Sequence, residues 1–78
     1  MKSLELNKAQ LSIIQSHIDR HEADIVSIRN EITELVDVEG KDYLTSERGL
    51  DNLKIISQHM ACIAALRELV LELNGVMI

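Results

Sequence analysis

The stretch LELNKAQLSIIQSHIDRHEADIVSIRNEITEL, residues 4–35, decides the fold of this chain. Its apolar residues recur every three or four positions, which places them along one face of an α-helix. In a heptad numbering that begins at position a with the first leucine, eight of the ten a and d positions are aliphatic. Five heptads in step predict one long helix with an apolar seam of the kind found in helical bundles. The a positions are Leu4, Leu11, Ile18, Ile25 and Ile32, and the d positions are Asn7, Ile14, His21, Ile28 and Leu35.

Both ends of this helix carry sequence signals. The segment Asn-Lys-Ala-Gln at residues 7–10 has the spacing of a capping box, and we prefer it to Ser3 as the start. Gly40 suits the position just after a helix, where the backbone takes a positive φ. We therefore predict a helix over about 7–38 and a turn over 39–45.

A second helix is predicted over about 46–74. Thr45 or Ser46 can cap its first turn, and Asn74 followed by Gly75 can end it. Its apolar residues are spread more widely than those of the first helix, so one neighbouring helix cannot cover them all. The seam holds Ile56, Ile63, Val70 and Met77 with His59, Leu66 and Leu73; one flank holds Ile55, Cys62, Leu69 and Val76, and the other holds Leu53 and Met60.

Two long helices joined by a short turn pack side by side in opposite directions. The expected fold is therefore all-α, an antiparallel two-helix hairpin in which residues 1–78 form a single domain. The leftover apolar surface requires a partner, and a second copy would complete a homodimeric four-helix bundle. The alternative is a monomer that keeps its apolar flank for another protein. The expected core consists of Leu11, Ile14, Ile18, Ile25, Ile28, Ile32, Leu35, Ile56, Ile63, Leu66, Val70 and Leu73.

Composition and charge restrict the partners of the chain. Its net charge of −5 disfavours nucleic acid and anionic lipid. The most apolar run, residues 60–66, is far shorter than the ~20 residues that span a bilayer. The first residues lack the apolar stretch of a signal peptide, and the single cysteine cannot form an internal disulfide. We expect a cytoplasmic protein that makes no membrane contact.

Three histidines form the first candidate site. His17 and His21 are four residues apart on one helical face, and Asp24 follows three residues later. The turn should bring His59 opposite the region of Asp24 and Ile25. Such a set of imidazoles and a carboxylate could hold Zn²⁺, but it lacks the glutamate after the first histidine that a zincin helix uses. We prefer to interpret His21 and His59 as polar interruptions that fix the register of the seam, with no metal or cofactor.

Carboxylates gather around the predicted turn. Between residues 30 and 47 the only basic residue is Lys41, and Glu47 follows at the start of the next helix. A cluster of this kind is either a solvated face or a docking surface for a protein with a basic surface. The candidate partner-binding residues are Glu31, Glu34, Asp37, Glu39 and Asp42.

No catalytic motif is recognisable, so we expect no enzymatic activity. The serines have no motif around them, and the chain has no glycine-rich phosphate loop. Cys62 lies among apolar residues and is expected to be a buried, inert thiol. Residues 46–51, Ser-Glu-Arg-Gly-Leu-Asp, partly resemble the Ser-Gln-Glu-Leu-Asp signature of short sporulation aspartyl-phosphate phosphatases. The serine lies one residue too far from the Leu-Asp pair, and that activity is therefore not assigned.

The expected architecture resembles that of Rop, a plasmid-encoded RNA-binding hairpin that pairs into a four-helix bundle. The likeness is one of shape, since the basic residues of this chain are scattered and outnumbered by carboxylates. Our hypothesis is a small adaptor or inhibitor, of a kind known by analogy from bacteria, phages and plasmids, that acts as a homodimer. A Rop-like nucleic-acid-binding dimer and a histidine-rich metal-binding bundle are the two alternatives. The scattered basic residues are Lys8, Arg20, Arg29, Lys54 and Arg67.

Overall fold

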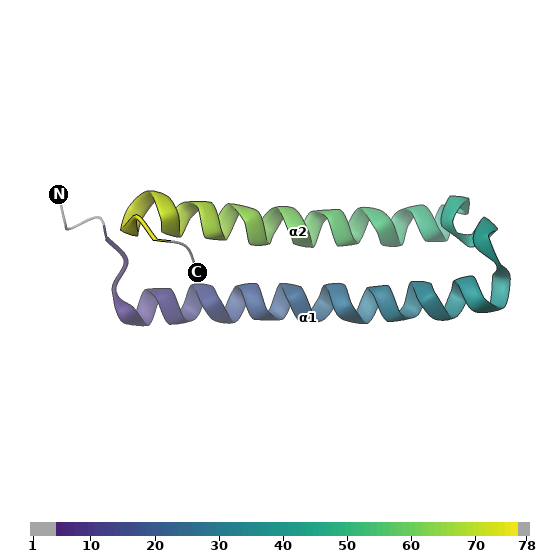
Figure 1. The fold of residues 1–78 in the computed structure, drawn as a ribbon, viewed down its shortest axis with the longest axis horizontal. Coiled ribbons are helices and arrows are strands. Elements are labelled where there is room, and N and C mark those ends of the chain that lie inside the picture. The colour runs from purple at the N-terminus through teal and green to yellow at the C-terminus, as the bar shows by residue number, and fades with distance from the viewer. Residues whose placement is uncertain (1–4, 77–78) are drawn as a thin grey trace.

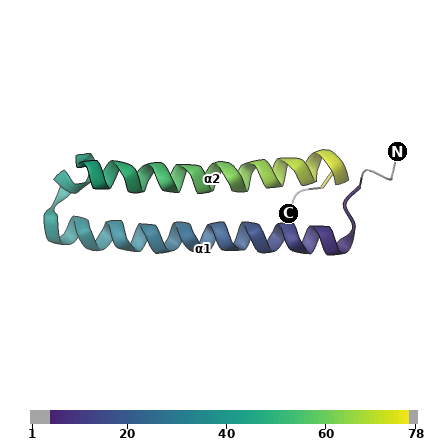
Figure 2. The ribbon, with the colours of Figure 1, turned by 180° about the vertical axis from the view of Figure 1, so that it is seen from behind.

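The computed structural model describes residues 5–76, which form two long helices joined by a short one. Helix α1 spans Lys8–Glu39, the 3-10 helix η2 spans Lys41–Thr45, and α2 spans Glu47–Asn74. The two long helices lie antiparallel over their whole length, as Figure 1 and the reverse view in Figure 2 show. The predicted all-α, antiparallel two-helix hairpin is confirmed.

Each long helix begins and ends with groups that satisfy its free backbone positions. At the start of α1 the Gln10 N–H donates to the Asn7 side chain, and the Gln10 side chain accepts from the Asn7 N–H, both at 2.9 Å. This is the predicted capping box. Gly40 ends α1 with a φ of +84°, and Gly75 ends α2 with a φ of +73° and donates to the Leu71 carbonyl at 2.8 Å. Glycine suits both positions because a positive φ crowds a Cβ.

The predicted turn contains η2, which is anchored by Tyr43. Only 3% of this side chain is exposed, and its hydroxyl accepts a hydrogen bond from Asn52 Nδ2 at 2.7 Å. Its backbone carbonyl accepts from the Ser46 N–H at 3.1 Å and from the Ser46 hydroxyl at 2.6 Å. The same hydroxyl caps α2 by accepting from the Gly49 N–H at 3.1 Å. Ser46 therefore caps α2 and also holds the turn in place.

The core of the hairpin is the line of contact between α1 and α2. Ile18, Ile25 and Ile63 form its buried centre, and Val70 is fully buried as well. Each of the twelve residues expected in the core is buried or half-buried within a single hairpin. Leu4 and Met77, which were assigned to the two seams, lie outside the described residues.

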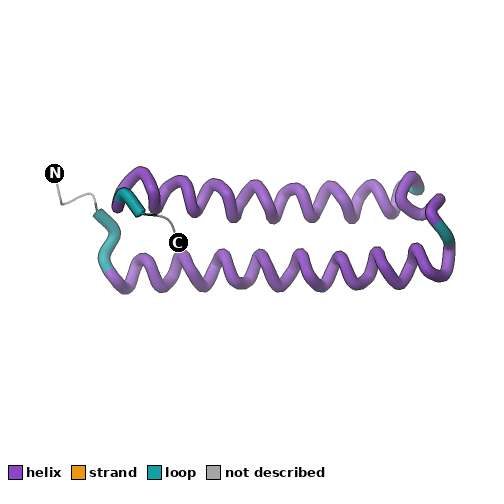
Figure 3. Tube along the Cα trace, in the orientation of Figure 1, coloured by secondary structure: helices purple, strands orange, loops and turns teal. Residues whose placement is uncertain are grey.

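Hydrogen bonds close the end of the hairpin that lies opposite the turn. The Asn74 side chain accepts from the Leu6 N–H through Oδ1 at 2.8 Å and donates to the Leu6 carbonyl through Nδ2 at 3.1 Å. Two segments separated by 68 positions in the chain are joined in this way. Figure 3 shows that most of the described chain is helical. The hydrogen bonds between Leu6 and Asn74 hold the two long helices together at one end, and the turn holds them together at the other.

Replacing Gly49 with alanine should destabilise the hairpin. A Cβ at this position would overlap the Tyr43 carbonyl, which two hydrogen bonds from Ser46 hold in place. Glycine-to-alanine changes that a helix can accommodate usually stabilise it by about 0.4–1 kcal/mol. Here we expect a loss of about 1–3 kcal/mol, the usual cost of forcing extra atoms into packed structure. Chemical denaturation measures the change, and a stabilised G49A variant would contradict the close contact.

Candidate functional site

His21 of α1 and His59 of α2 contact each other across the seam. Their Nδ1 atoms are 2.8 Å apart, the ring centroids are 5.0 Å apart, and the ring planes are inclined by 55°. This centroid separation is close to the longest that such an Nδ1–Nδ1 distance permits, so each Nδ1 points at the other. Both side chains are half-buried. The contact is therefore an inter-helix hydrogen bond between two imidazoles.

This hydrogen bond dictates how protons are arranged on the pair. One ring must carry a proton on Nδ1, and the other must present an Nδ1 lone pair. Two rings that both carried a proton on Nδ1 would turn two donors toward each other. The histidine pair is thus a polar layer with a defined donor and a defined acceptor inside an otherwise aliphatic seam.

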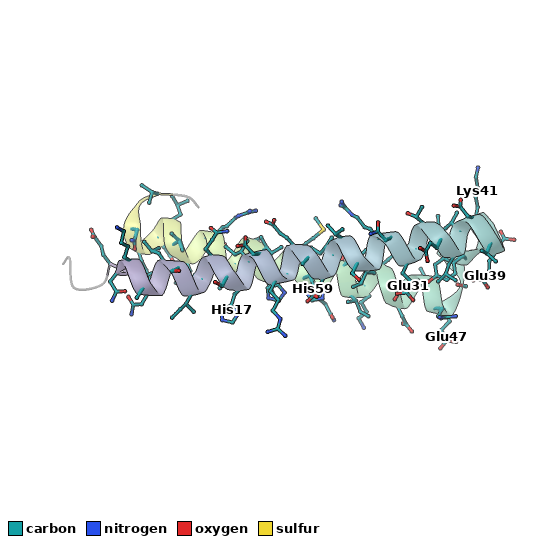
Figure 4. All side chains as sticks on the ribbon, turned by 90° about the horizontal axis from the view of Figure 1, so that it is seen from below. His17, Glu31, Glu39, Lys41, Glu47 and His59 are labelled. Carbon is teal, nitrogen blue, oxygen red and sulfur yellow. The ribbon has the colours of Figure 1, made fainter. Side chains whose placement is uncertain are left out.

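The candidate metal ligands do not converge. His59 was expected opposite the region of Asp24 and Ile25, and it contacts His21, about one helical turn earlier in α1, while the Asp24 side chain is exposed. Asp24 and His17 are exposed, and Figure 4 shows His17 nearer to the terminal end of the rod than His59. Within residues 5–76 no group of three or more His, Cys, Asp or Glu side chains is placed to hold a metal ion.

A groove with charged walls runs along one side of the seam. We call it the Arg67 groove; it has a volume of about 370 Å³, and its walls include Glu22, Arg29 and Arg67 beside Met60. The Arg67 Nη2 donates to Glu22 Oε1 at 3.0 Å, which links α2 to α1 across this groove. Both partners are more than a third exposed, so the ion pair contributes little to stability.

A second groove lies on the opposite side of the seam and carries no carboxylate, lysine or arginine on its walls. We call it the Cys62 groove; it has a volume of about 400 Å³ and is lined by His17, His21, Cys62, Ala65 and Leu66. The thiol of Cys62 was expected to be buried, and in the single hairpin it is exposed. The expectation failed because Cys62 lies on the flank of α2 and α1 covers only the seam.

Exposed apolar side chains continue along α2 beside both grooves. Ile55 and Leu69 lie one heptad on either side of Cys62 and are 39% and 41% exposed, and Met60 beside the other groove is 53% exposed. These residues do not make α2 a membrane helix, because none of the helices in the described part of the chain is long and apolar enough to cross a bilayer. They form a wide apolar face that α1 leaves uncovered.

The carboxylates proposed for partner binding lie at the turn end of the hairpin. Glu31, Glu39 and Glu47 are gathered toward this end in Figure 4, with Lys41 at its tip. The five candidate residues are all exposed, and the neighbouring Val38 side chain is 83% exposed. We call the surface formed by Glu31, Glu34, Asp37, Glu39 and Asp42 the acidic end.

Sequence reasoning missed three features of this arrangement. The burial of Tyr43 had one available signal, since it is the only aromatic residue in the chain and lies in a turn. The close approach of Gly49 to the turn also had a signal in the sequence, because a glycine in the first turn of a helix often marks a close approach of two backbones. No signal in the sequence indicated the hydrogen bonds between Asn74 and Leu6, because an asparagine before a glycine is already explained as the end of a helix.

Comparisons of the chain with models of protein families, with curated proteins and with solved structures find no match. Two features of the hairpin itself therefore indicate its function, namely the uncovered apolar face and the acidic end.

Replacing both histidines with leucine should stabilise the hairpin more than the two single replacements predict together. Each single change, His21→Leu or His59→Leu, leaves the other half-buried Nδ1 without its partner, whereas the double change leaves two aliphatic side chains in contact. A double-mutant cycle by chemical denaturation should give a coupling energy of about 0.5–3 kcal/mol, the range for residues in direct contact. Additive effects would show that the imidazoles do not interact.

Nitrogen-15 NMR of the imidazoles supplies an independent check on the same pair. At neutral pH one of the two rings should carry its proton on Nδ1 and the other should not, while exposed His17 serves as an internal reference. The His17→Gln variant leaves the pair untouched and assigns the reference signal. Two rings that both lack a proton on Nδ1 would contradict the hydrogen bond.

Proposed function

We propose that the protein is a small, non-enzymatic interaction protein that works as a homodimer and binds a basic surface on another protein through its acidic end. The observation that carries this proposal is that one hairpin leaves many large apolar side chains exposed. The two parts of the proposal, self-association and partner binding, rest on different regions of the molecule.

Self-association is supported by the size of the exposed surface. The chain exposes 5921 Å², whereas a compact monomer of 8.8 kDa is expected to expose about 4,800 Å². Its radius of gyration of 16.7 Å likewise exceeds the roughly 11.5 Å expected for a compact chain of this length. The excess of about 1,100 Å² is comparable to the area of about 800 Å² that each partner contributes to a standard interface. A second copy would remove this excess and complete a four-helix bundle.

Partner binding is supported by the charge at the turn. Five exposed carboxylates at the acidic end repel one another, and a basic surface would relieve that repulsion when it binds. Val38 adds an exposed aliphatic side chain at the same place, where it can be buried by a partner. A nucleic acid is disfavoured because the net charge is −5 and because Arg67, which lines a groove with Arg29, is already engaged by Glu22.

Self-association predicts a particle of twice the chain mass. Light scattering on a sizing column should give about double 8.8 kDa. The thermal unfolding midpoint should rise with protein concentration, because only folded chains associate into the dimer. A monomer whose cooperative melting is independent of concentration would contradict the dimer.

Reversing the charge of the acidic end should weaken partner binding without unfolding the protein. Glu34 and Asp37 are exposed, so the E34K/D37K variant should keep its helix content and gain slightly in stability from reduced repulsion. Immobilised wild-type protein is compared with this variant in extracts of the native host at low and high salt. We expect proteins that the wild type retains at low salt to be lost from E34K/D37K and released from the wild type by salt.

A matched control separates the position of the charges from their number. The E5K/D19K variant changes the net charge by the same amount at two exposed positions away from the turn, one just before α1 and one in its first half. It should retain the same proteins as the wild type. If E34K/D37K retains them equally well, the acidic end is only a solubilising face. Binding of generic RNA or DNA in a salt-dependent gel shift would instead favour the nucleic-acid alternative.

A further inference from the structure

We propose that a second copy of the chain docks on the Cys62 groove and on the row formed by Ile55, Cys62 and Leu69 of α2, with a two-fold axis passing near Cys62. This inference rests on the self-association proposed above and assigns it a face and an orientation. In the resulting dimer the two α2 helices lie antiparallel against each other, and the Arg67 groove remains in solvent.

The walls of the two grooves differ in a way that selects one of them. The Arg67 groove contains Glu22, Arg29 and Arg67, and covering it would remove three charged groups from water. The Cys62 groove has none of these residue types on its walls, and it is flanked by Ile55 and Leu69. Since removing charges from water is costly unless each is newly paired, the Cys62 side is the favourable one to bury.

The row on α2 matches a second copy of itself. In a two-fold dimer the same patch is used by both chains, so each residue must suit the residue that the symmetry places opposite it. Ile55 and Leu69 stand seven positions before and after Cys62. Antiparallel pairing about Cys62 therefore sets Ile55 of each chain against Leu69 of the other, and it leaves small residues, Ala61 and Ala65, near the axis where the helices must approach closely.

The charges beside this row are also self-complementary. Lys54 and Glu68 are exposed and occupy the same heptad position on α2, one residue before Ile55 and Leu69 respectively. Antiparallel pairing about Cys62 places Lys54 of one chain near Glu68 of the second, and the symmetry repeats the pair at the other end of the row. In a parallel two-fold dimer the two copies of this flank would lie on opposite sides of the interface, so Lys54 and Glu68 could not pair, which favours the antiparallel orientation.

Cross-linking through the native cysteine tests this face directly. Because Cys62 is exposed in one hairpin and lies near the two-fold axis of the dimer, two copies of the thiol should be close enough to bond. Diamide oxidises two thiols to one disulfide and takes up the two electrons and two protons released. Treatment of the wild-type dimer should convert most of the protein to a disulfide-linked pair, at protein concentrations too low for chance collisions to link a thiol that lies outside the interface. The matched control, C62S/M60C, moves the only thiol to the Arg67 groove and should remain unlinked.

A pair of charge substitutions gives a second readout that does not depend on chemistry at sulfur. Leu69→Glu places a carboxylate in the proposed interface and should raise the dissociation constant by about a hundredfold or more, whereas Met60→Glu at the Arg67 groove should leave it nearly unchanged. Both side chains are exposed in the hairpin, so neither change disrupts the core, and circular dichroism checks the helix content. If L69E fails to fold, the cross-linking comparison still decides the question.

The outcomes separate this inference from the proposed function. A dimer that cross-links through Cys62 and dissociates with L69E supports both. A dimer that cross-links only through M60C, or dissociates with M60E and not with L69E, keeps the self-association but overturns the assigned face. A monomer at all accessible concentrations overturns the self-association and the face together.

Discussion

A pair of helices touches along one line, and every apolar side chain away from that line stays in water. This constraint governs the whole molecule. The seam of α1 is narrow and is almost fully used by the contact with α2, whose apolar face is wider. The result is a rod of 55 × 17 × 14 Å with a thin core, in which only a few of the side chains of residues 5–76 are fully buried. Surface that cannot be hidden within the chain is available for binding.

The thin core places unusual weight on the polar groups that hold the helices in register. The Tyr43 carbonyl and the Ser46 hydroxyl fix the turn, and the two histidines bond midway along the seam. Aliphatic side chains of similar size can slide past one another with little change in energy, whereas a hydrogen bond with one donor and one acceptor has a single favourable alignment. These hydrogen bonds therefore favour one register, and the aliphatic seam supplies most of the attraction.

How much could be predicted from the sequence depended on how local the signal was. The heptads, the capping box at Asn7 and the terminating glycines are set by neighbours within a few residues, and the helix bounds followed from them. The partner of His59 and the exposure of Cys62 depend on which faces two distant segments turn toward each other. The sequence shows that Cys62 has apolar neighbours, but whether its side chain is buried depends on the helix packed against α2. Helix α1 covers only the seam of α2, and Cys62 on the flank stays exposed.

The hydrogen bonds between Leu6 and Asn74 also determine how the hairpin would be oriented if it were attached to a larger protein. They bring the entry and the exit of the rod together at one end, while the acidic end lies at the other, so the longest dimension of the molecule separates the two. A tether attached before Leu6 or after Asn74 would therefore hold the rod by its base and leave the opposite tip free. A domain fused at either terminus would lie at the base of the rod, and the acidic end would point away from that domain.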